Sequence, residues 1–179
     1  TLKLSNSPDL RSVILPEEFN ILTLDLSECP GLVSLLSLNS HPKIKHLNLK
    51  GCLSLVDLPE NLKSTQIYLN GCRSIVELKN IKTDYLNLSR CISLRLLQNI
   101  KARYLNLTDC VSLPSLPDGL RLEHLYLVGC VSLDSLPDSL KVDGVLDCKR
   151  CRNLKSLPAT GVKARQIDLA DCGGLESLP

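Results

Sequence analysis

Aromatic side chains are scarce in this sequence: its 179 residues include four tyrosines, one phenylalanine and no tryptophan. Compact cores normally use aromatic rings for bulk. This chain must therefore build its interior from branched aliphatic residues, of which 41 leucines form the largest group. Methionine is absent as well, and the chain begins at Thr1. We therefore expect an ordered piece of a longer or processed protein.

A strong charge of either sign is also missing, because 21 basic residues face 19 acidic ones and the net charge is +2. This balance is unlike that of proteins that hold nucleic acid through bulk charge, or of polybasic membrane anchors. No apolar run approaches the roughly 18 residues of a membrane-spanning helix, and no signal peptide opens the chain. The composition predicts no membrane insertion and makes nucleic acid an unlikely partner.

A repeated pattern covers the whole chain. The passages "YLNLSRCISLRLL", "YLNLTDCVSLPSL" and "HLYLVGCVSLDSL", which begin at Tyr85, Tyr104 and His124, align without gaps. The unit is apolar-x-Leu-x-x-Cys-x-x-Leu-x-x-Leu, usually followed by proline. Nine such units begin near residues 2, 24, 47, 67, 86, 105, 125, 146 and 167. Residues 1–179 are therefore expected to form one repeat domain.

The apolar-x-Leu step has a period of two, which predicts a short strand with both apolar side chains on one face. One unit cannot bury that face alone, so stacked units should place their strands side by side in a parallel sheet, about 4.8 Å apart. The predicted fold is a solenoid of the α/β type that is mostly β, with about nine short strands. Leu-Pro steps favour an extended or 3-10 path on the opposite side, and only the segment after Leu35 has room for a short helical turn.

Eight of the nine cysteines lie at one position of the unit, and Cys148 replaces a strand leucine. A free cysteine behaves as a small buried residue with a weak S–H donor, so each thiol is expected inside the solenoid, pointing at a backbone carbonyl. Because the count of nine cysteines is odd and the repeat supplies one thiol per unit, the pattern predicts reduced cysteines in a cytosol-like compartment rather than disulfide pairs. Cys148 and Cys151 form a lone C-x-x-C. A zinc or redox site is the alternative to a structural role, but further ligands are missing from the neighbouring pattern.

No catalytic constellation is visible. His41 lies in the long loop of the second unit, and His46 and His124 flank strands four units apart. The serines and glycines recur at fixed positions of the unit, as turn residues do. We expect no enzyme activity, no cofactor, no metal and no small-molecule substrate within these residues.

The repeat, for example "LYLVGCVSLDSLP", resembles the leucine-rich repeat family over the full chain, with Cys where the family usually has Asn. The resemblance implies a horseshoe with the strands on its concave face. Short units containing "SLPDGL" and "SLPDSL" resemble those of effector proteins that pathogenic bacteria secrete into host cells. The alternative resemblance is to plant intracellular immune receptors, whose units are usually longer.

All four tyrosines fall at strand positions that alternate with the inward residues, on four successive strands, and two histidines share that face. Tyrosine on an exposed sheet is a typical binding anchor, although it also favours strands for stability alone. The predicted binding residues are Tyr68, Tyr85, Tyr104, Tyr126, His46, His124, Asn87 and Asn106.

A second periodic feature is basic, because a lysine or arginine follows the last apolar residue in six successive units. These residues are Lys63, Lys82, Lys101, Arg121, Lys141 and Lys163. Stacking should align them along one edge, as a strip for an acidic partner or an RNA backbone, or merely for solubility and protection against edge pairing. Of these interpretations, solubility is favoured.

Together these features predict a module that binds a protein partner, expected to be a host protein, through its strand face, as part of a bacterial effector that acts in host cytosol. The alternatives are the ligand-sensing region of an intracellular immune receptor and the substrate-recruiting arm of an enzyme whose catalytic domain lies outside these residues.

Overall fold

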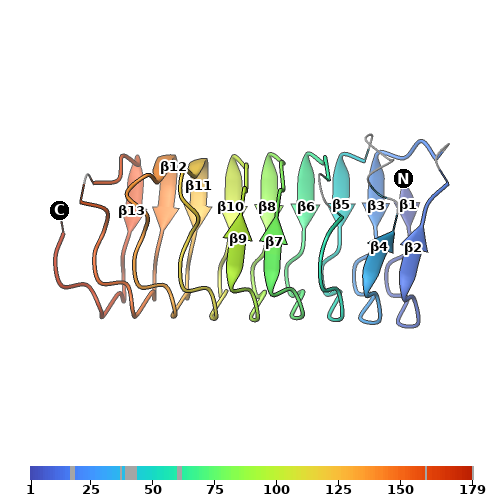
Figure 1. Ribbon diagram of the computed structural model, residues 1–179, viewed down its shortest axis with the longest axis horizontal. Coiled ribbons are helices and arrows are strands. Elements are labelled where there is room, and N and C mark those ends of the chain that lie inside the picture. Colours follow the sequence, from blue (N-terminus) through green and yellow to red (C-terminus); the bar gives the residue numbers. More distant parts are fainter. Residues whose placement is uncertain (17–18, 37, 39–43, 60–61, 160, 179) are drawn as a thin grey trace.

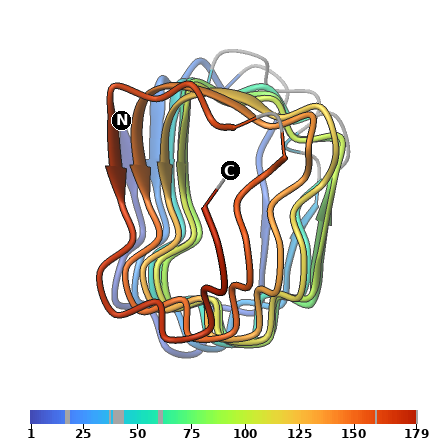
Figure 2. The ribbon, with the colours of Figure 1, turned by 90° about the vertical axis from the view of Figure 1, so that its left-hand side faces the viewer.

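The computed structural model describes residues 1–16, 19–36, 38, 44–59, 62–159 and 161–178. Its described residues form a parallel β-solenoid in which each coil lies directly on the one before (Figure 1). Viewed down the stack, the coils superimpose, with the long sheet along one side (Figure 2). This confirms the predicted mostly-β solenoid of stacked units about 20 residues apart. None of the described residues belongs to a helix long and apolar enough to cross a lipid bilayer.

Nine strands form the main sheet, and all neighbouring strands run parallel. In spatial order they are β1 (Leu2–Lys3), β3 (Thr23–Asp25), β5 (His46–Asn48), β6 (Gln66–Tyr68), β8 (Tyr85–Asn87), β10 (Tyr104–Asn106), β11 (Arg121–Tyr126), β12 (Lys141–Asp147) and β13 (Gln166–Asp168). Each predicted first apolar position pairs with that of the next unit, as Leu86 does with Leu105 and Leu105 with Leu125. The repeat phase therefore sets the sheet register.

The opposite side of the coils also pairs, over shorter stretches. Strand β2 (Ser12–Ile14) pairs with β4 (Ser34–Leu36), and β7 (Glu77–Lys79) pairs with β9 (Leu96–Gln98), both in parallel. Isolated bridges continue this side at Ser135, Ser156 and Ser177. This agrees with the extended path predicted there. On both sides of the solenoid, successive coils are separated by one strand spacing, so the stack of coils is nearly straight in Figure 1. The horseshoe curvature that the resemblance implies stays a prediction. The helical turn predicted after Leu35 involves residues 37 and 39–43, which are outside the described residues.

The interior is filled by aliphatic side chains and thiols, and no aromatic ring is among the buried residues that the structure describes. Leu105 and Leu107 of one coil are fully buried, together with Leu113 from its loop, while Leu116 and Leu120 are almost so. The same pattern recurs from coil to coil in one continuous cluster. The scarcity of aromatic residues is thus matched by a narrow interior that leucine fills.

The nine cysteines are all free and buried, which confirms their predicted interior position. Eight thiols donate a hydrogen bond to a carbonyl of the preceding coil. In the middle of the stack, Cys110 Sγ lies 3.1 Å from the Leu88 oxygen and Cys130 Sγ lies 3.1 Å from the Leu107 oxygen. Each acceptor lies three residues before the previous unit's cysteine, or before Ser7 in the first unit, so the bonds form a continuous series, which we call the thiol ladder. The thiols of the ladder belong to Cys29, Cys52, Cys72, Cys91, Cys110, Cys130, Cys151 and Cys172.

Burial changes the acidity of these thiols. Desolvation raises the pKa of Cys52 to about 11, and those of Cys91 and Cys130 to about 12. Desolvation likewise raises the pKa of Cys72 and of Cys110. Because the thiolate is the reactive form of cysteine, these five thiols are chemically quiet in the folded protein. Cys151 differs, because a hydrogen bond from the Cys148 thiol lowers its pKa.

Candidate interaction surface on the nine-stranded sheet

The strands place alternate side chains on the outward face of the main sheet, in rows that run across the stack. One row contains His46, Gln66, Tyr85, Tyr104 and His124, because each of these residues pairs with the next in register. The adjacent row is two residues further along each strand and contains Asn48, Tyr68, Asn87, Asn106 and Tyr126. All ten side chains are partly buried, so each keeps some accessible surface.

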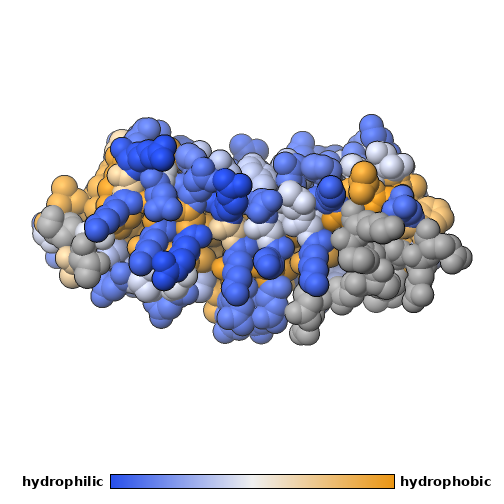
Figure 3. Space-filling model, turned by 90° about the horizontal axis from the view of Figure 1, so that it is seen from above, coloured by the Kyte–Doolittle hydropathy of each residue, from blue (hydrophilic) through white to orange (hydrophobic). Residues whose placement is uncertain are grey.

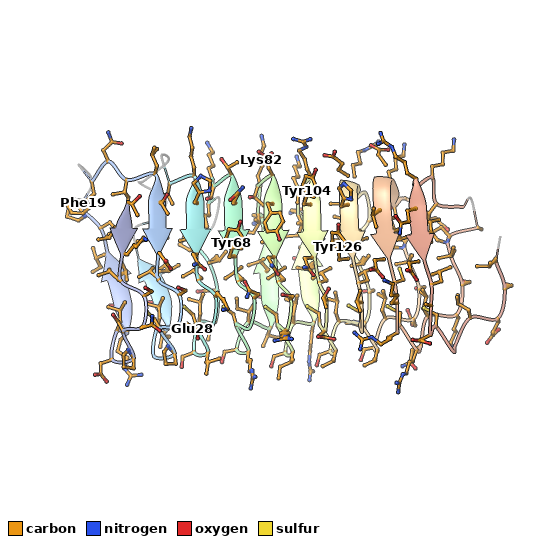
Figure 4. All side chains as sticks on the ribbon, turned by 180° about the vertical axis from the view of Figure 1, so that it is seen from behind. Phe19, Glu28, Tyr68, Lys82, Tyr104 and Tyr126 are labelled. Carbon is orange, nitrogen blue, oxygen red and sulfur yellow. The ribbon has the colours of Figure 1, made fainter. Side chains whose placement is uncertain are left out.

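Five rings on these two rows form a chain of ring contacts, which we call the aromatic band: Tyr68, Tyr85, Tyr104, His124 and Tyr126. The Tyr68 and Tyr85 ring centroids are 5.3 Å apart, and those of Tyr85 and Tyr104 are 6.3 Å apart. His124 stacks on Tyr104 at 4.8 Å and lies 6.3 Å from Tyr126, nearly parallel to both. Figure 4 shows Tyr68, Tyr104 and Tyr126 along the sheet. The structure thus brings all four predicted tyrosines and one predicted histidine together.

His46 is connected to the band through a hydrogen-bonded glutamine. The Gln66 Oε1 atom lies 2.9 Å from His46 Nδ1 and accepts a hydrogen bond from the Tyr68 hydroxyl at 3.1 Å. An amide oxygen only accepts, so His46 carries its proton on Nδ1 in this contact. Burial raises the pKa of the Tyr68 phenol, and Tyr85 adds to that rise. Gln66 is not among the binding residues that the sequence predicts.

Asn87 and Asn106 have a structural task in addition to their place on the surface. The Oδ1 atom of Asn87 accepts from the backbone N–H of Ser89 at 3.0 Å, and that of Asn106 accepts from Thr108 at 2.9 Å. Such side-chain contacts two residues ahead stabilise turns. The same bond is made by Asp25, Asn48, Asp147 and Asp168. The recurrence of Asn or Asp at this position of the unit was the sequence signal for this role.

His124 fits the band because strand β12 bulges beside it. Leu122 pairs with Val142 but His124 pairs with Val145, so β12 contains one additional residue there. A Cβ on Gly144 would lie 2.6 Å from the Glu123 oxygen and 2.9 Å from His124 Cε1, so only glycine leaves space for the ring. Within the described part of the chain, His124 Nδ1 is buried without a hydrogen-bond partner.

A band of cations borders this surface at the end where the strands begin. Lys63, Lys82 and Lys101 are paired through parallel bridges, and Arg121 pairs with Lys141. The six predicted residues, with the exposed neighbours Lys45, Arg103 and Arg165, form what we call the basic edge. Figure 3 views the molecule from this end and shows hydrophilic side chains gathered along it. Its only ion pair among the described residues joins Arg103 to Glu123 at 2.7 Å.

The C-x-x-C pair lies inside the solenoid. Cys148 and Cys151 are fully buried, and a hydrogen bond between the two thiols, with burial, raises the pKa of Cys148. Cys151 donates to the Leu127 carbonyl at 3.0 Å as a member of the ladder. Throughout the described ranges, no group of three or more His, Cys, Asp or Glu side chains is placed to hold a metal ion.

In comparisons with known proteins, the chain matches no family model, and no curated protein matches its sequence.

Proposed function

We propose that this chain is a recognition module of the leucine-rich repeat type that binds a protein partner with the outward face of its main sheet, which the resemblance implies to be the concave one. The observation that carries the proposal is the aromatic band. Its rings contact one another in an unbroken chain yet remain partly accessible, whereas none of the buried residues that the structure describes is aromatic. Large, stiff rings with polar tips are typical of the residues that dominate binding energy at protein interfaces.

The surroundings of the band support the same proposal. An interface usually has an apolar centre within a polar rim. Here Gln66, Asn87 and Asn106 flank the rings, and His46 extends the polar rim at the β5 side. Since Asn87 and Asn106 use their Oδ1 atoms in turns, we assign the main binding contribution to the rings and a positioning role to these two amides.

The test replaces two rings at the centre of the band. Tyr85→Ala with Tyr104→Ala should leave the fold intact and weaken partner binding by at least about 2 kcal/mol, roughly 25-fold in affinity. The partner is identified by cross-linking and quantitative mass spectrometry with the wild-type chain, and its affinity for each variant is then measured by calorimetry.

The matched control replaces two exposed residues on the opposite side, Glu77→Ala with Gln98→Ala, on β7 and β9. This variant should bind as the wild type does. Equal binding by the tyrosine variant and the wild type would contradict the proposal, and circular dichroism of both variants checks that the fold is retained.

We further propose that the module acts in a reducing compartment, as part of a bacterial effector that binds a host protein in host cytosol. The buried, free thiols support the reducing compartment, and the short units that resemble those of effectors support the biological setting. The proposal assigns no catalytic role to this chain. Sequencing of the complete gene tests the setting: a nucleotide-binding domain before the repeats would favour the immune-receptor alternative, and a ligase or transferase domain would favour the enzyme arm.

A further inference from the structure

The charges of this chain are distributed unevenly, although their sum is close to zero. The basic edge contains nine exposed cations: Lys45, Lys63, Lys82, Lys101, Arg103, Arg121, Lys141, Lys163 and Arg165. Three acidic residues, Asp84, Glu123 and Asp143, lie among them, so the edge is strongly positive and the remainder of the described chain is net negative. A segregated charge pattern is a physical signal for a partner of the opposite sign.

Six of these cations occupy equivalent positions in six successive coils, and none of the six has an ion pair within the described ranges. Stacking places them at about one strand spacing per coil, roughly 4.8 Å. The arrangement is repulsive in the free protein. A bound chain of negative charges along the stack would relieve that repulsion at every coil.

The edge is grooved, so that it offers more than a flat array of charges. One groove of about 600 Å³ is lined by Lys63, Lys82, Lys101 and Arg103, together with Asp84 and Ala102. A second, of about 650 Å³, is lined by Arg103, Arg121 and Arg165 together with the acidic Glu123 and Asp143. Arg103 borders both grooves, so the two lie next to each other in the middle of the stack, and we call them together the track.

The track adjoins the aromatic band. Lys82 precedes Tyr85 by three residues and Lys101 precedes Tyr104 by three, a separation of roughly 10 Å along an extended chain. Figure 4 shows Lys82 at the edge beside the strands that display the tyrosines. Arg103 also lies over the Tyr104 ring, 6.0 Å from its centroid. A protein that covers the rings would therefore also reach the cations.

We infer that the partner of this surface contributes an acidic polypeptide segment that lies along the basic edge while an apolar part of the same partner covers the aromatic band. This inference rests on the proposed binding role of the sheet face and names the chemistry of the partner. A polypeptide fits better than a nucleic acid because Asp84 and Asp143 interrupt the track at intervals. Spaced carboxylates on flexible side chains can avoid those positions, whereas a phosphate backbone presents charge continuously.

The test measures binding of a fluorescein-labelled peptide of ten glutamates by fluorescence polarisation, in about 25 mM NaCl, where charges are weakly screened. Lys82→Gln with Lys101→Gln should weaken binding at least about tenfold. The matched control, Lys79→Gln with Lys155→Gln, removes the same charge from exposed positions away from the edge. It should change affinity less than about twofold.

Three results would overturn the inference: no binding of the glutamate peptide to the wild type, equal losses in both lysine variants, or tighter binding of a ten-nucleotide oligouridylate at the same lysines. The last result would make the edge a nucleic-acid site. Failure here is distinguishable from failure of the proposed function, because the tyrosine variant is expected to bind the glutamate peptide normally while losing the protein partner.

Discussion

The residue immediately before each ladder cysteine has a left-handed backbone in every coil. Its φ is 72° at Gly51, 61° at Arg90 and 58° at Asp109, and Asn6 adopts the same conformation before Ser7 in the first unit. L-residues avoid this region because Cβ approaches the carbonyl, whereas glycine enters it freely. Glycine occupies this position in only three coils, at Gly51, Gly71 and Gly129. The other coils therefore carry a small local strain.

Arg90→Gly should relieve that strain and raise the free energy of unfolding by about 0.5–1 kcal/mol. The Arg90–Asp109 ion pair that it removes is long, 3.9 Å, and exposed, so little is lost. Urea unfolding measures the difference. As a control, Arg73→Gly, at the residue that directly follows Cys72 and has no positive φ, should destabilise; equal effects of the two changes would contradict the argument.

Cys110→Ser should lower the free energy of unfolding by about 1–3 kcal/mol, because it buries a hydroxyl where the thiol fits and where the shorter C–O bond reaches the Leu88 carbonyl less well. Urea unfolding at neutral pH measures this loss.

In the wild-type protein, thiol reagents should label the buried cysteines slowly in the folded state and fully in the denatured state. Fast labelling of more than one or two thiols in the folded state would contradict the burial of the ladder.

At the scale of the strand, stability depends on which face of the coil a side chain occupies. Leu107 is fully buried directly after β10, so Leu107→Ala should cost about 2–5 kcal/mol in free energy of unfolding. Ser115 is exposed in the same coil, and Ser115→Ala should change the free energy of unfolding by no more than about 0.5 kcal/mol. Thermal and urea unfolding compare the two. Similar losses would show that the inside and outside assignments are exchanged.

The strand register could be predicted from the sequence because one pattern, apolar-x-Leu, is repeated at every coil, and a slip of one residue would expose its leucines. The bulge of β12 could not be predicted from the sequence. The unit that begins at Leu125 is one residue longer than the one before it, but only the structure shows that the additional residue lies within β12 and that Gly144 gives His124 its space.

The candidate surface, like the fold, could be predicted from the sequence only in part. Strand alternation placed Tyr85 and Tyr104 on one face, and the structure places them in contact. The hydrogen bonds of Gln66 and the turn contacts of Asn87 depend on side-chain conformations, which periodicity does not determine. The lack of ion pairs at the six aligned cations, within the part of the chain that the structure describes, likewise depends on three-dimensional neighbours.

At the scale of the whole molecule, the buried thiols act together in setting the response to pH. Unfolded thiols lose their protons near pH 8.5–9, whereas burial raises the pKa of Cys91 and Cys130 to about 12. Above about pH 9 the unfolded chain therefore binds fewer protons than the folded one, and the free energy of unfolding falls as pH rises. Each such thiol contributes up to about 1.4 kcal/mol per pH unit.

Urea unfolding between about pH 7.5 and about pH 10 should accordingly show a steep loss of stability. Cys91→Ala with Cys130→Ala should start from a lower stability at neutral pH but decline less steeply as the pH is raised. Parallel curves for this variant and the wild type would exclude the thiols as the cause of the alkaline loss.

The regular pairing of the coils also makes the length of the molecule adjustable. Because Tyr85 pairs with Tyr104 and Leu86 with Leu105, residues 86–104 are one complete building block. Cutting them out would join Tyr85 directly to Leu105, and every remaining strand would keep its neighbour's phase. Duplication of such blocks could lengthen this protein, and their loss could shorten it, in fixed steps of about 4.8 Å, so that its reach along a partner would be altered without the design of a new fold.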